Sequence, residues 1–171
     1  KRKRRMFSNI ENMTIVTPSK WLANLVGKSM LQKYPIRVIN NGIDLSIFKP
    51  TESDFKEKKE LTDKKIILGV AFDWGERKGL DIFIKLAELL PNKYKIVLVG
   101  TNPTIDLLLP KTILTIHQTN NQIELAAIYT AADIFVNPTR EDNYPTVNME
   151  ALACGTPVIT FRTGGSPEMI D

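Results

Sequence analysis

The chain has 171 residues, of which 43% are hydrophobic and 25% charged, and this length fits one α/β domain with part of a second. Its single cysteine, Cys154, excludes an intrachain disulfide and suits a reducing cytoplasm, and with one histidine the sequence offers no zinc cluster. No apolar run approaches the roughly 18 residues that a membrane-spanning helix needs, and no signal peptide is visible.

The positive charge of the chain is concentrated at its start. The net charge is +4, and the first five residues, Lys1–Arg5, are all basic; without them 18 basic residues face 19 acidic ones. Such a run is typical of nucleic-acid binding, of contact with anionic lipid headgroups, or of a solvated chain start. Because the remaining sequence has no basic stripe with interleaved aromatic residues, we expect no nucleic acid as partner, while peripheral contact with the inner face of a membrane stays open.

The first third of the chain predicts short elements around a polar segment. Ser19 is a good N-cap for an amphipathic helix, and the sequence Asn40-Asn41-Gly42 is a strong turn signal. From Asp44 to Asp63 the composition turns polar and charged, which predicts a loop or linker. The elements expected here are a strand over Ile15–Thr17, a helix over Lys20–Leu31, a strand over Arg37–Ile39 and a short helix near Glu52–Leu61.

The rest of the chain alternates between strand-like and helix-like segments. The expected strands are Lys65–Ala71, Tyr94–Gly100, Ile113–Ile116, Ile134–Val136 and Val158–Thr160. The expected helices are Leu80–Leu90, Ile105–Leu109, Ile123–Ala132 and Thr146–Cys154. Several strands are apolar throughout, which is typical of a parallel sheet covered on both faces. We therefore predict an α/β fold with a Rossmann-like parallel sheet and helices on both faces, and ligands of such sheets lie beyond the carboxyl ends of the strands.

Five loops follow these strands and should open on one rim. They are Phe72–Gly79, Thr101–Pro103, His117–Asn121, the acidic loop up to Pro145, and Phe161–Ser166. Their cations, amides, paired glycines and carboxylates suit a ligand with both phosphates and hydroxyls. The sequence lacks GxGxxG and GxxxxGK[ST], and it has no Asp-x-Asp pair for a metal-bridged diphosphate. Phosphate charge would then be met by Arg77, Lys78 and helix N-termini.

Glu150 is the most informative single residue. It lies inside a predicted helix beside small and apolar neighbours, four residues after Thr146. A carboxylate there can accept two hydrogen bonds from a vicinal diol such as ribose, each contributing about 1.5–3 kcal/mol. The alternative is an ordinary exposed helix acid. His117 has two similar interpretations, as part of a base pocket or as an ordinary loop histidine.

Several segments together resemble one family. Asp142 to Glu150 is similar to the E-x7-E element of retaining glycosyltransferases of family 4, which have the GT-B fold. The segments EALACGTPVI, TGGSPE, LAAIYTAADIFVNPT, GERKG and VINNGIDLSIF match that family in order. The resemblance implies that residues 1–40 end the acceptor domain and its connection, and that residues 41–171 form a nucleotide-sugar-binding domain. The abrupt start and end suggest a fragment.

The resemblance also implies roles for individual residues. Glu150 would bind ribose hydroxyls, Asp142 would contact the donor sugar, and Lys78 would bind the diphosphate; these three form the expected catalytic set. The wider donor site would comprise Arg77, Lys78, Glu141, Asp142, Asn143, Tyr144, Pro145, Thr146, Val147, Glu150, Gly164 and Gly165. The base pocket would comprise His117, Gln118, Thr119, Asn120 and Ile123.

Some positions depart from the family pattern. The first acid is Asp142 rather than Glu, with Glu141 directly before it, so either could fill that role. Pro145 removes an N–H that could have faced the ligand. Asp73 stands where an arginine is common, and Arg77 is the nearest substitute for its charge.

The expected function is transfer of a sugar from a nucleoside-diphosphate sugar, with retention, to a polysaccharide or glycolipid intermediate. We expect no metal or other cofactor, and a cytoplasmic location that includes the inner face of the membrane. With the acceptor domain missing, the fragment would bind the donor without turnover. The alternatives are a non-catalytic nucleotide-binding or protein-interaction module of the same fold and, less favoured, a nucleic-acid binder that uses Lys1–Arg5.

Overall fold

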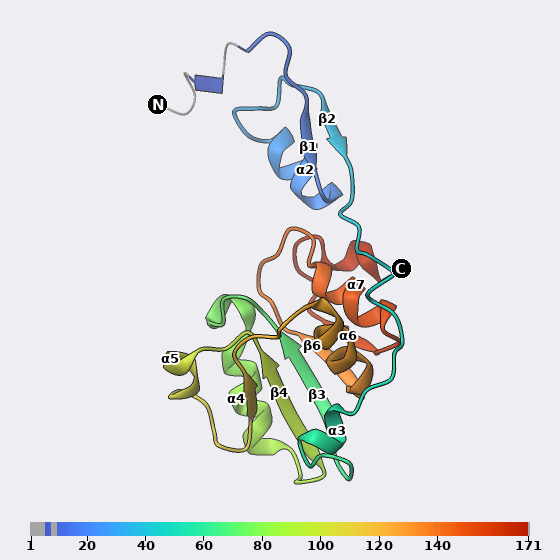
Figure 1. The fold of residues 1–171 in the computed structure, drawn as a ribbon. Coiled ribbons are helices and arrows are strands. Elements are labelled where there is room, and N and C mark those ends of the chain that lie inside the picture. Colours follow the sequence, from blue (N-terminus) through green and yellow to red (C-terminus); the bar gives the residue numbers. More distant parts are fainter. Residues whose placement is uncertain (1–5, 8–9, 171) are drawn as a thin grey trace. The chain divides into compact units, whose positions relative to one another are not determined.

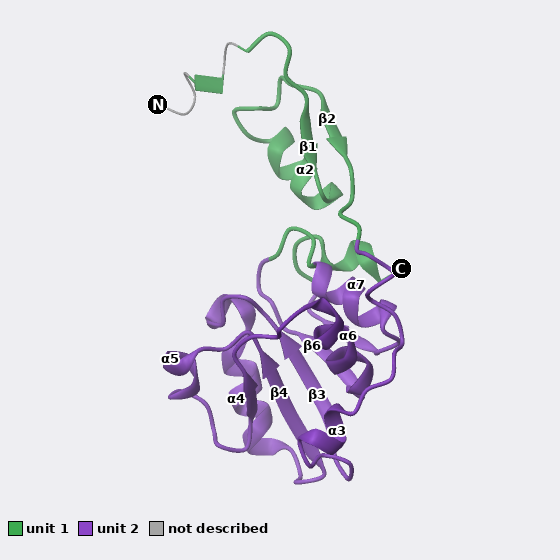
Figure 2. Ribbon diagram, viewed as in Figure 1, with its two compact units in different colours: residues 1–42, 142–145, 162–171 green, residues 43–141, 146–161 purple. Residues whose placement is uncertain are grey.

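The computed structural model describes residues 6–7 and 10–170, which form two compact units (Figure 2). Unit 1 combines the described residues up to Gly42 with Asp142–Pro145 and with the segment that begins at Arg162. Unit 2 comprises Ile43–Glu141 and Thr146–Phe161. Since unit 1 also takes two segments from late in the chain, the division into domains at residues 40 and 41 stays a prediction.

Unit 2 is built on a five-stranded sheet in which every pairing is parallel (Figure 1). The strands are β3 (Lys65–Val70), β4 (Tyr94–Val99), β5 (Leu114–Ile116), β6 (Ile134–Asn137) and β7 (Val158–Thr160). Their order in the sheet is β5-β4-β3-β6-β7. The chain therefore moves outward from β3 in one direction and then returns to its other side, so that the order reverses between β3 and β6. The predicted parallel sheet is confirmed, and this reversal is the place where such sheets bind ligands.

Helices cover both faces of this sheet, as the continuous apolar strands indicated. On one face, Ile66 and Leu68 of β3 pack in a core with residues of α3, α6 and α7. On the other face, Ile67 packs with Phe83 of α4. The helices are α3 (Phe55–Lys58), α4 (Leu80–Leu89), α5 (Pro103–Asp106), α6 (Gln122–Ala131) and α7 (Thr146–Ala153). Cys154 is buried in the first core.

Unit 1 contains one β-α-β segment. Strands β1 (Ile15–Thr17) and β2 (Ile36–Val38) pair in parallel, and α2 (Lys20–Gly27) connects them. Ser19 caps α2 as predicted, because its hydroxyl accepts a hydrogen bond from the Leu22 N–H at 3.1 Å.

Two helix boundaries differ from the prediction for local reasons. Helix α2 ends at Gly27 rather than at residue 31. Just after this end, the Ser29 hydroxyl donates to the carbonyl of Val26, which lies in the last turn of the helix. Helix α5 begins earlier than predicted because Asn102 caps it by accepting from the Ile105 N–H, with Pro103 at its first position.

A partly exposed charge cluster stabilises the junction of α6 and β6. The carboxylate of Asp133 accepts hydrogen bonds from the ammonium groups of Lys56 and Lys65, both at 2.8 Å, and from the Ile66 N–H at 2.9 Å. Burial raises the pKa of Asp133, but these three donors outweigh it and lower the pKa from its ordinary 3.8 to about 2. The carboxylate therefore stabilises the fold in its charged form.

Substitution of Asp133 should produce a stability loss that depends on pH. We expect Asp133→Asn to lower the free energy of unfolding by about 2 kcal/mol at pH 7, the equivalent of its pKa depression. Because the folded pKa is depressed, this contribution is present above pH 4 and disappears as the pH falls toward 2. Urea unfolding of both proteins between pH 7 and pH 2 measures it. Asp63→Asn is the control, since the Asp63 side chain is 72% exposed; a difference that persists at pH 2 would contradict the assignment.

Candidate functional site: a pocket at the carboxyl ends of β3, β4 and β5

A cavity of about 670 Å³ opens in unit 2 where three neighbouring strands end. The ends of β3, β4 and β5 line it together with residues of α6 and α7. Its lining residues are Val70, Ala71, Phe72, Val99, Gly100, Thr101, Asn102, His117, Gln118, Thr119, Asn121, Gln122, Leu125, Val147 and Glu150. Three of the five loops expected on one rim therefore do meet there. The volume lies within the range of about 300–1,000 Å³ typical of small-molecule sites.

Glu150 reaches this pocket from α7 and is partly buried. Its Oε2 accepts a hydrogen bond from the hydroxyl of Tyr129 at 3.0 Å, and Thr146 also hydrogen-bonds to the carboxylate. Burial raises the pKa of Glu150, whereas the bonds from Tyr129 and Thr146 oppose that rise. Glu150 is thus a fixed acceptor in a cavity, and the interpretation as an ordinary exposed helix acid is wrong.

Tyr129 is the residue that fixes this carboxylate, and the sequence analysis did not single it out. Its side chain is fully buried and makes edge-on contacts with the rings of Phe48 and Phe135, at 6.3 and 5.5 Å between centroids. Burial raises the pKa of Tyr129 well above its usual value, and the charge of Glu150 raises it further. The hydroxyl therefore stays protonated and donates to Glu150.

His117 lines the pocket directly after β5. Its Nε2 lies 2.6 Å from Oδ2 of Asp106, which also receives a hydrogen bond from the hydroxyl of Thr115 at 3.3 Å. Burial raises the pKa of Asp106, but the bonds from His117 and other donors outweigh it and lower that pKa overall. Asp106 therefore holds the His117 ring in one orientation at the pocket wall.

The predicted base-pocket residues divide into two groups. His117, Gln118 and Thr119 line the cavity, whereas Asn120 and Ile123 do not. The Asn120 side chain donates to the carboxylate of Glu124 at 2.8 Å, and Ile123 is 66% exposed. Their neighbours Asn121 and Gln122 line the cavity instead.

Apolar side chains form much of the remaining wall. Val70, Leu125 and Val147 line the cavity, and Phe72, at the end of β3, has a fully exposed side chain. An exposed aromatic ring beside a pocket can pack against the flat face of a base. Trp74, two residues further on, is instead buried, and its indole N–H donates to the carbonyl of Val99 at 2.9 Å.

Arg77 and Lys78 lie on the loop that begins at Phe72, but they are not among the residues lining the cavity. They form a single 3-10 turn, Glu76–Lys78, which directly precedes α4. The carbonyl of Arg77 accepts hydrogen bonds from the Arg140 N–H at 2.8 Å and from the Thr139 hydroxyl at 3.3 Å. The loop is therefore attached to the segment that follows β6.

The remaining predicted residues belong to other surroundings. Glu141 is exposed in unit 2, and Thr146 contacts Glu150 directly. The stretch Asp142–Pro145, which contains Asn143 and Tyr144, belongs to unit 1 together with Gly164 and Gly165. Their part in donor binding stays a prediction.

The paired glycines have a structural reason within unit 1. Gly164 has φ +54°, and a Cβ there would lie 1.8 Å from the carbonyl oxygen of Asp142. A Cβ on Gly165 would lie 2.0 Å from the carbonyl oxygen of Asn143. Both positions therefore require glycine so that the two backbone segments can approach each other, whether or not a ligand also approaches them.

Glu168 likewise has partners in unit 1. Its carboxylate accepts hydrogen bonds from the backbone N–H groups of Lys20 and Trp21, each at 2.9 Å, at the first turn of α2. A carboxylate in this position satisfies amide groups that have no partner within the helix.

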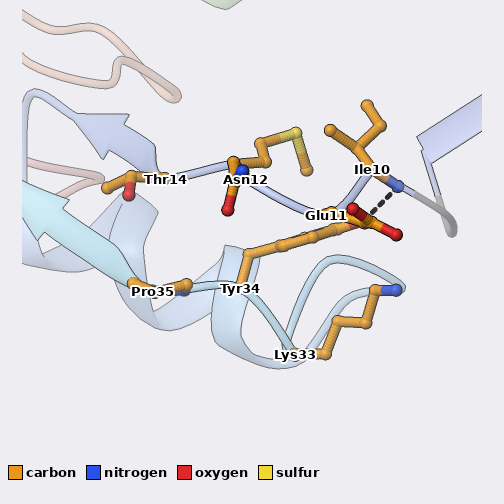
Figure 3. Close-up of a pocket in the computed structure, with 8 residues that line it drawn as sticks. Ile10, Glu11, Asn12, Thr14, Lys33, Tyr34 and Pro35 are labelled. Carbon is orange, nitrogen blue, oxygen red and sulfur yellow. Dashed lines mark hydrogen bonds between the residues drawn. The ribbon is translucent and has the colours of Figure 1, made fainter.

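Unit 1 also has a pocket of its own, of about 740 Å³ (Figure 3). Two short segments line it, Ile10–Thr14 and Lys33–Pro35. The ring of Tyr34 extends toward Ile10, whose N–H donates to the tyrosine hydroxyl at 3.3 Å. None of the predicted site residues lines this pocket. The basic run Lys1–Arg5, on which the nucleic-acid and membrane alternatives depend, lies outside the described residues.

Comparison with known proteins identifies the class to which this fold and pocket belong. The family model described as glycosyl transferases group 1 matches residues 51–171, and the chain belongs to this family. Its structural neighbours are GT-B glycosyltransferases. Sucrose-phosphate synthase from Thermosynechococcus elongatus has a TM-score of 0.82 at 25% identity, covering 99% of this chain and 45% of that one. Anabaena HepE, in complex with UDP-glucose, has a TM-score of 0.79 at 18% identity, covering 99% and 51%.

Curated relatives extend well beyond the part that this chain matches. The D-inositol 3-phosphate glycosyltransferase of Mycolicibacterium smegmatis is 29% identical over 146 residues, covering 77% of this chain and 33% of that protein. The sulfoquinovosyl transferase of Arabidopsis thaliana is 24% identical over 173 aligned positions, covering 97% and 34%. The chain thus spans about a third of the length of these two relatives.

Within the described residues, no helix is both long and apolar enough to cross a membrane.

Burial raises the pKa of Glu150, and the hydrogen bond from the Tyr129 hydroxyl opposes that rise and so favours the charged form, which a substitution can test. We expect Tyr129→Phe to raise the pKa of Glu150 further, because burial remains while an opposing hydrogen bond is lost. A pH titration of the glutamate side-chain carboxyl signals by ¹³C NMR, with Glu150→Gln for assignment, measures this shift. Tyr94→Phe, which alters a tyrosine outside the pocket, should leave the signal unchanged. A Glu150 pKa that stays constant or falls in Tyr129→Phe would show that this bond does not control the carboxylate.

Proposed function

We propose that this chain supplies the donor-binding part of a retaining glycosyltransferase of family 4, which transfers a sugar from a nucleoside-diphosphate sugar to a glycan or lipid-linked acceptor. The observation that carries the proposal is the position of Glu150, a fixed carboxylate inside the cavity at the strand ends. A vicinal diol is a matching partner, because its two hydroxyls can both donate to one carboxylate. Polysaccharide or glycolipid assembly at the cytoplasmic side of a membrane is the setting we propose.

The pocket lining supports separate positions for the ribose and for the base of the nucleoside. The ribose hydroxyls would face Glu150, since it is the only carboxylate among the cavity-lining residues in the described part of the chain. The base would lie against His117, Gln118 and Thr119, with Phe72 available to cover its flat face.

The diphosphate requires cations that the cavity wall does not provide. Lys78, with Arg77 beside it, is the group that we propose for this role, and Asp142 or Glu141 would contact the donor sugar. A cation at about 4 Å from a phosphate oxygen contributes about 4 kcal/mol at an effective dielectric constant near 20, before desolvation. We propose that this loop stabilises the leaving nucleoside diphosphate and that the reaction uses no metal.

The solved neighbours supply a first choice of nucleotide. HepE was solved with UDP-glucose, with UDP and glucose, and with UDP. UDP is therefore the first nucleotide to test on this chain, followed by GDP, ADP and dTDP. Binding should raise the melting temperature, because a ligand that binds only the folded state stabilises it by mass action.

Removal of the Glu150 carboxylate should weaken nucleotide binding. We expect Glu150→Ala to reduce the affinity for the responding nucleoside diphosphate by about 1.5–3 kcal/mol, the contribution of a charge-assisted hydrogen bond. The affinity for the corresponding nucleoside should fall equally, because both ligands carry the ribose. Isothermal titration calorimetry measures both constants. Glu88→Ala, which removes an exposed acid from α4, is the matched control. The proposal fails if none of the four nucleotides binds, or if Glu150→Ala binds as wild type does.

Turnover by this chain can be tested separately from binding. We expect the 171-residue chain to bind UDP-glucose, or the sugar nucleotide of the responding base, without forming a glycoside on added glycan or glycolipid acceptors. The chain spans about a third of the length of two curated relatives that it matches, and the groups of the candidate site are those proposed for the donor. Product analysis by mass spectrometry after prolonged incubation checks this, and accumulation of a new glycoside would refute it.

A further inference from the structure

Arg140 connects the two segments that carry most of the charged residues of the proposed site. It follows Thr139 after β6, and its guanidinium donates to both carboxylate oxygens of Asp81, each at 2.8 Å. It also donates to the carbonyl of Glu76. Asp81 lies in the first turn of α4, so one side chain contacts the loop of Arg77 and Lys78 both before and after those residues.

The backbone of residues 138–140 also lies close to the backbone of the loop that carries Arg77 and Lys78. The Arg140 N–H donates to the carbonyl of Arg77 at 2.8 Å. Gly79 has φ +75°, and a Cβ there would lie 2.5 Å from the carbonyl oxygen of Pro138. Position 79 therefore requires glycine, and residues 138–140 pack directly against the turn that carries Lys78.

We propose that Arg140 is a positioning residue for diphosphate binding, which acts through Asp81 and the Glu76 carbonyl to hold the loop of Arg77 and Lys78 in place. This inference rests on the proposed function, because it assigns the loop a phosphate to bind. Arg140 directly precedes the acids Glu141 and Asp142, and it would act on the loop rather than on the ligand. Two parallel bonds to one carboxylate fix an orientation that a single contact would not fix.

Stability alone does not explain this arrangement. The side chains of Arg140 and Asp81 are 39% and 46% exposed, and exposed ion pairs contribute little to the free energy of folding. Their geometry has a stronger consequence, because a small displacement of a group that binds a reacting phosphate costs affinity and rate. The contact should therefore influence ligand binding more than it influences the melting temperature.

Asp81→Asn separates positioning from direct electrostatics, because the two predict changes of opposite sign. If Arg140 bound the phosphates itself, removal of the negative charge of Asp81 would strengthen binding of a nucleoside diphosphate. If Arg140 positions the loop through Asp81, the same substitution weakens it. We expect Asp81→Asn and Arg140→Ala each to weaken binding by roughly tenfold. The double variant should be no weaker than Arg140→Ala, since that substitution already removes the contact with Asp81.

The ligands must include a nucleoside for comparison. The probes are UDP, GDP, ADP and dTDP, each measured by calorimetry beside its own nucleoside. In Arg140→Ala and Asp81→Asn the nucleoside affinity should stay within twofold of wild type, because the nucleoside carries no phosphate for Arg77 and Lys78 to bind. Arg140→Lys retains the charge but lacks the paired donors, so it should resemble Arg140→Ala. Lys111→Ala, an exposed cation before β5, controls for the change in net charge.

Each outcome distinguishes the two proposals. If the wild type binds none of the nucleoside diphosphates, the proposed function fails and this inference with it. If the wild type binds one of them and Asp81→Asn binds it equally or more tightly, only the inference fails. It also fails if nucleoside and nucleoside diphosphate lose affinity equally, since that result indicates a general change in the fold.

Discussion

The hydrogen bond from Tyr129 to Glu150 connects the hydrophobic core of unit 2 to its candidate site. Tyr129 is held by aromatic contacts with Phe48 and Phe135, and its backbone carbonyl accepts from the buried hydroxyl of Thr156 at 2.6 Å. Its position is therefore set by packing rather than by the ligand. A carboxylate that depends on such a partner is oriented before a ligand arrives, which lowers the conformational entropy that binding must overcome.

The topology of the sheet explains why this carboxylate faces a cavity. Helices α6 and α7 cover the same face of the sheet, and the order of the strands reverses between β3 and β6. At such a reversal the connections leave in opposite directions, and the end of β3, which lies beside the reversal, lines the cavity together with the ends of β4 and β5. Glu150 lies on α7 and shares the cavity with the ends of β3 and β4, although it is 51 to 85 residues from these strands in the sequence.

The sequence predicted those features that depend on local patterns. Continuous apolar strands predicted a parallel sheet covered on both faces, which is confirmed. Alternation of elements predicted that five loops share a rim, and three of them, those after β3, β4 and β5, line one cavity. The contacts that orient the site were not predictable, because each joins residues whose separation in the sequence follows no periodic pattern. Tyr129 and Glu150 are 21 residues apart, and Asp81 and Arg140 are 59 apart. The glycines at 164 and 165 indicated a close approach, but not that backbone would be the neighbour.

The signs of the charges determine how a nucleoside diphosphate would lie in the pocket. A phosphate oxygen at about 4 Å from the Glu150 carboxylate would be repelled by about 4 kcal/mol at an effective dielectric constant near 20, more than one hydrogen bond recovers. The neutral, hydroxyl-bearing ribose is the part of the ligand that this acceptor tolerates. The phosphates must then extend away from α7, and the loop after β3 carries two cations, Arg77 and Lys78, while its first residue, Phe72, lines the cavity. Such a site has its carboxylate on α7 and its cations on the loop after β3, so both must be held in place. Tyr129 holds the carboxylate of Glu150, and Arg140 would hold the loop with the cations.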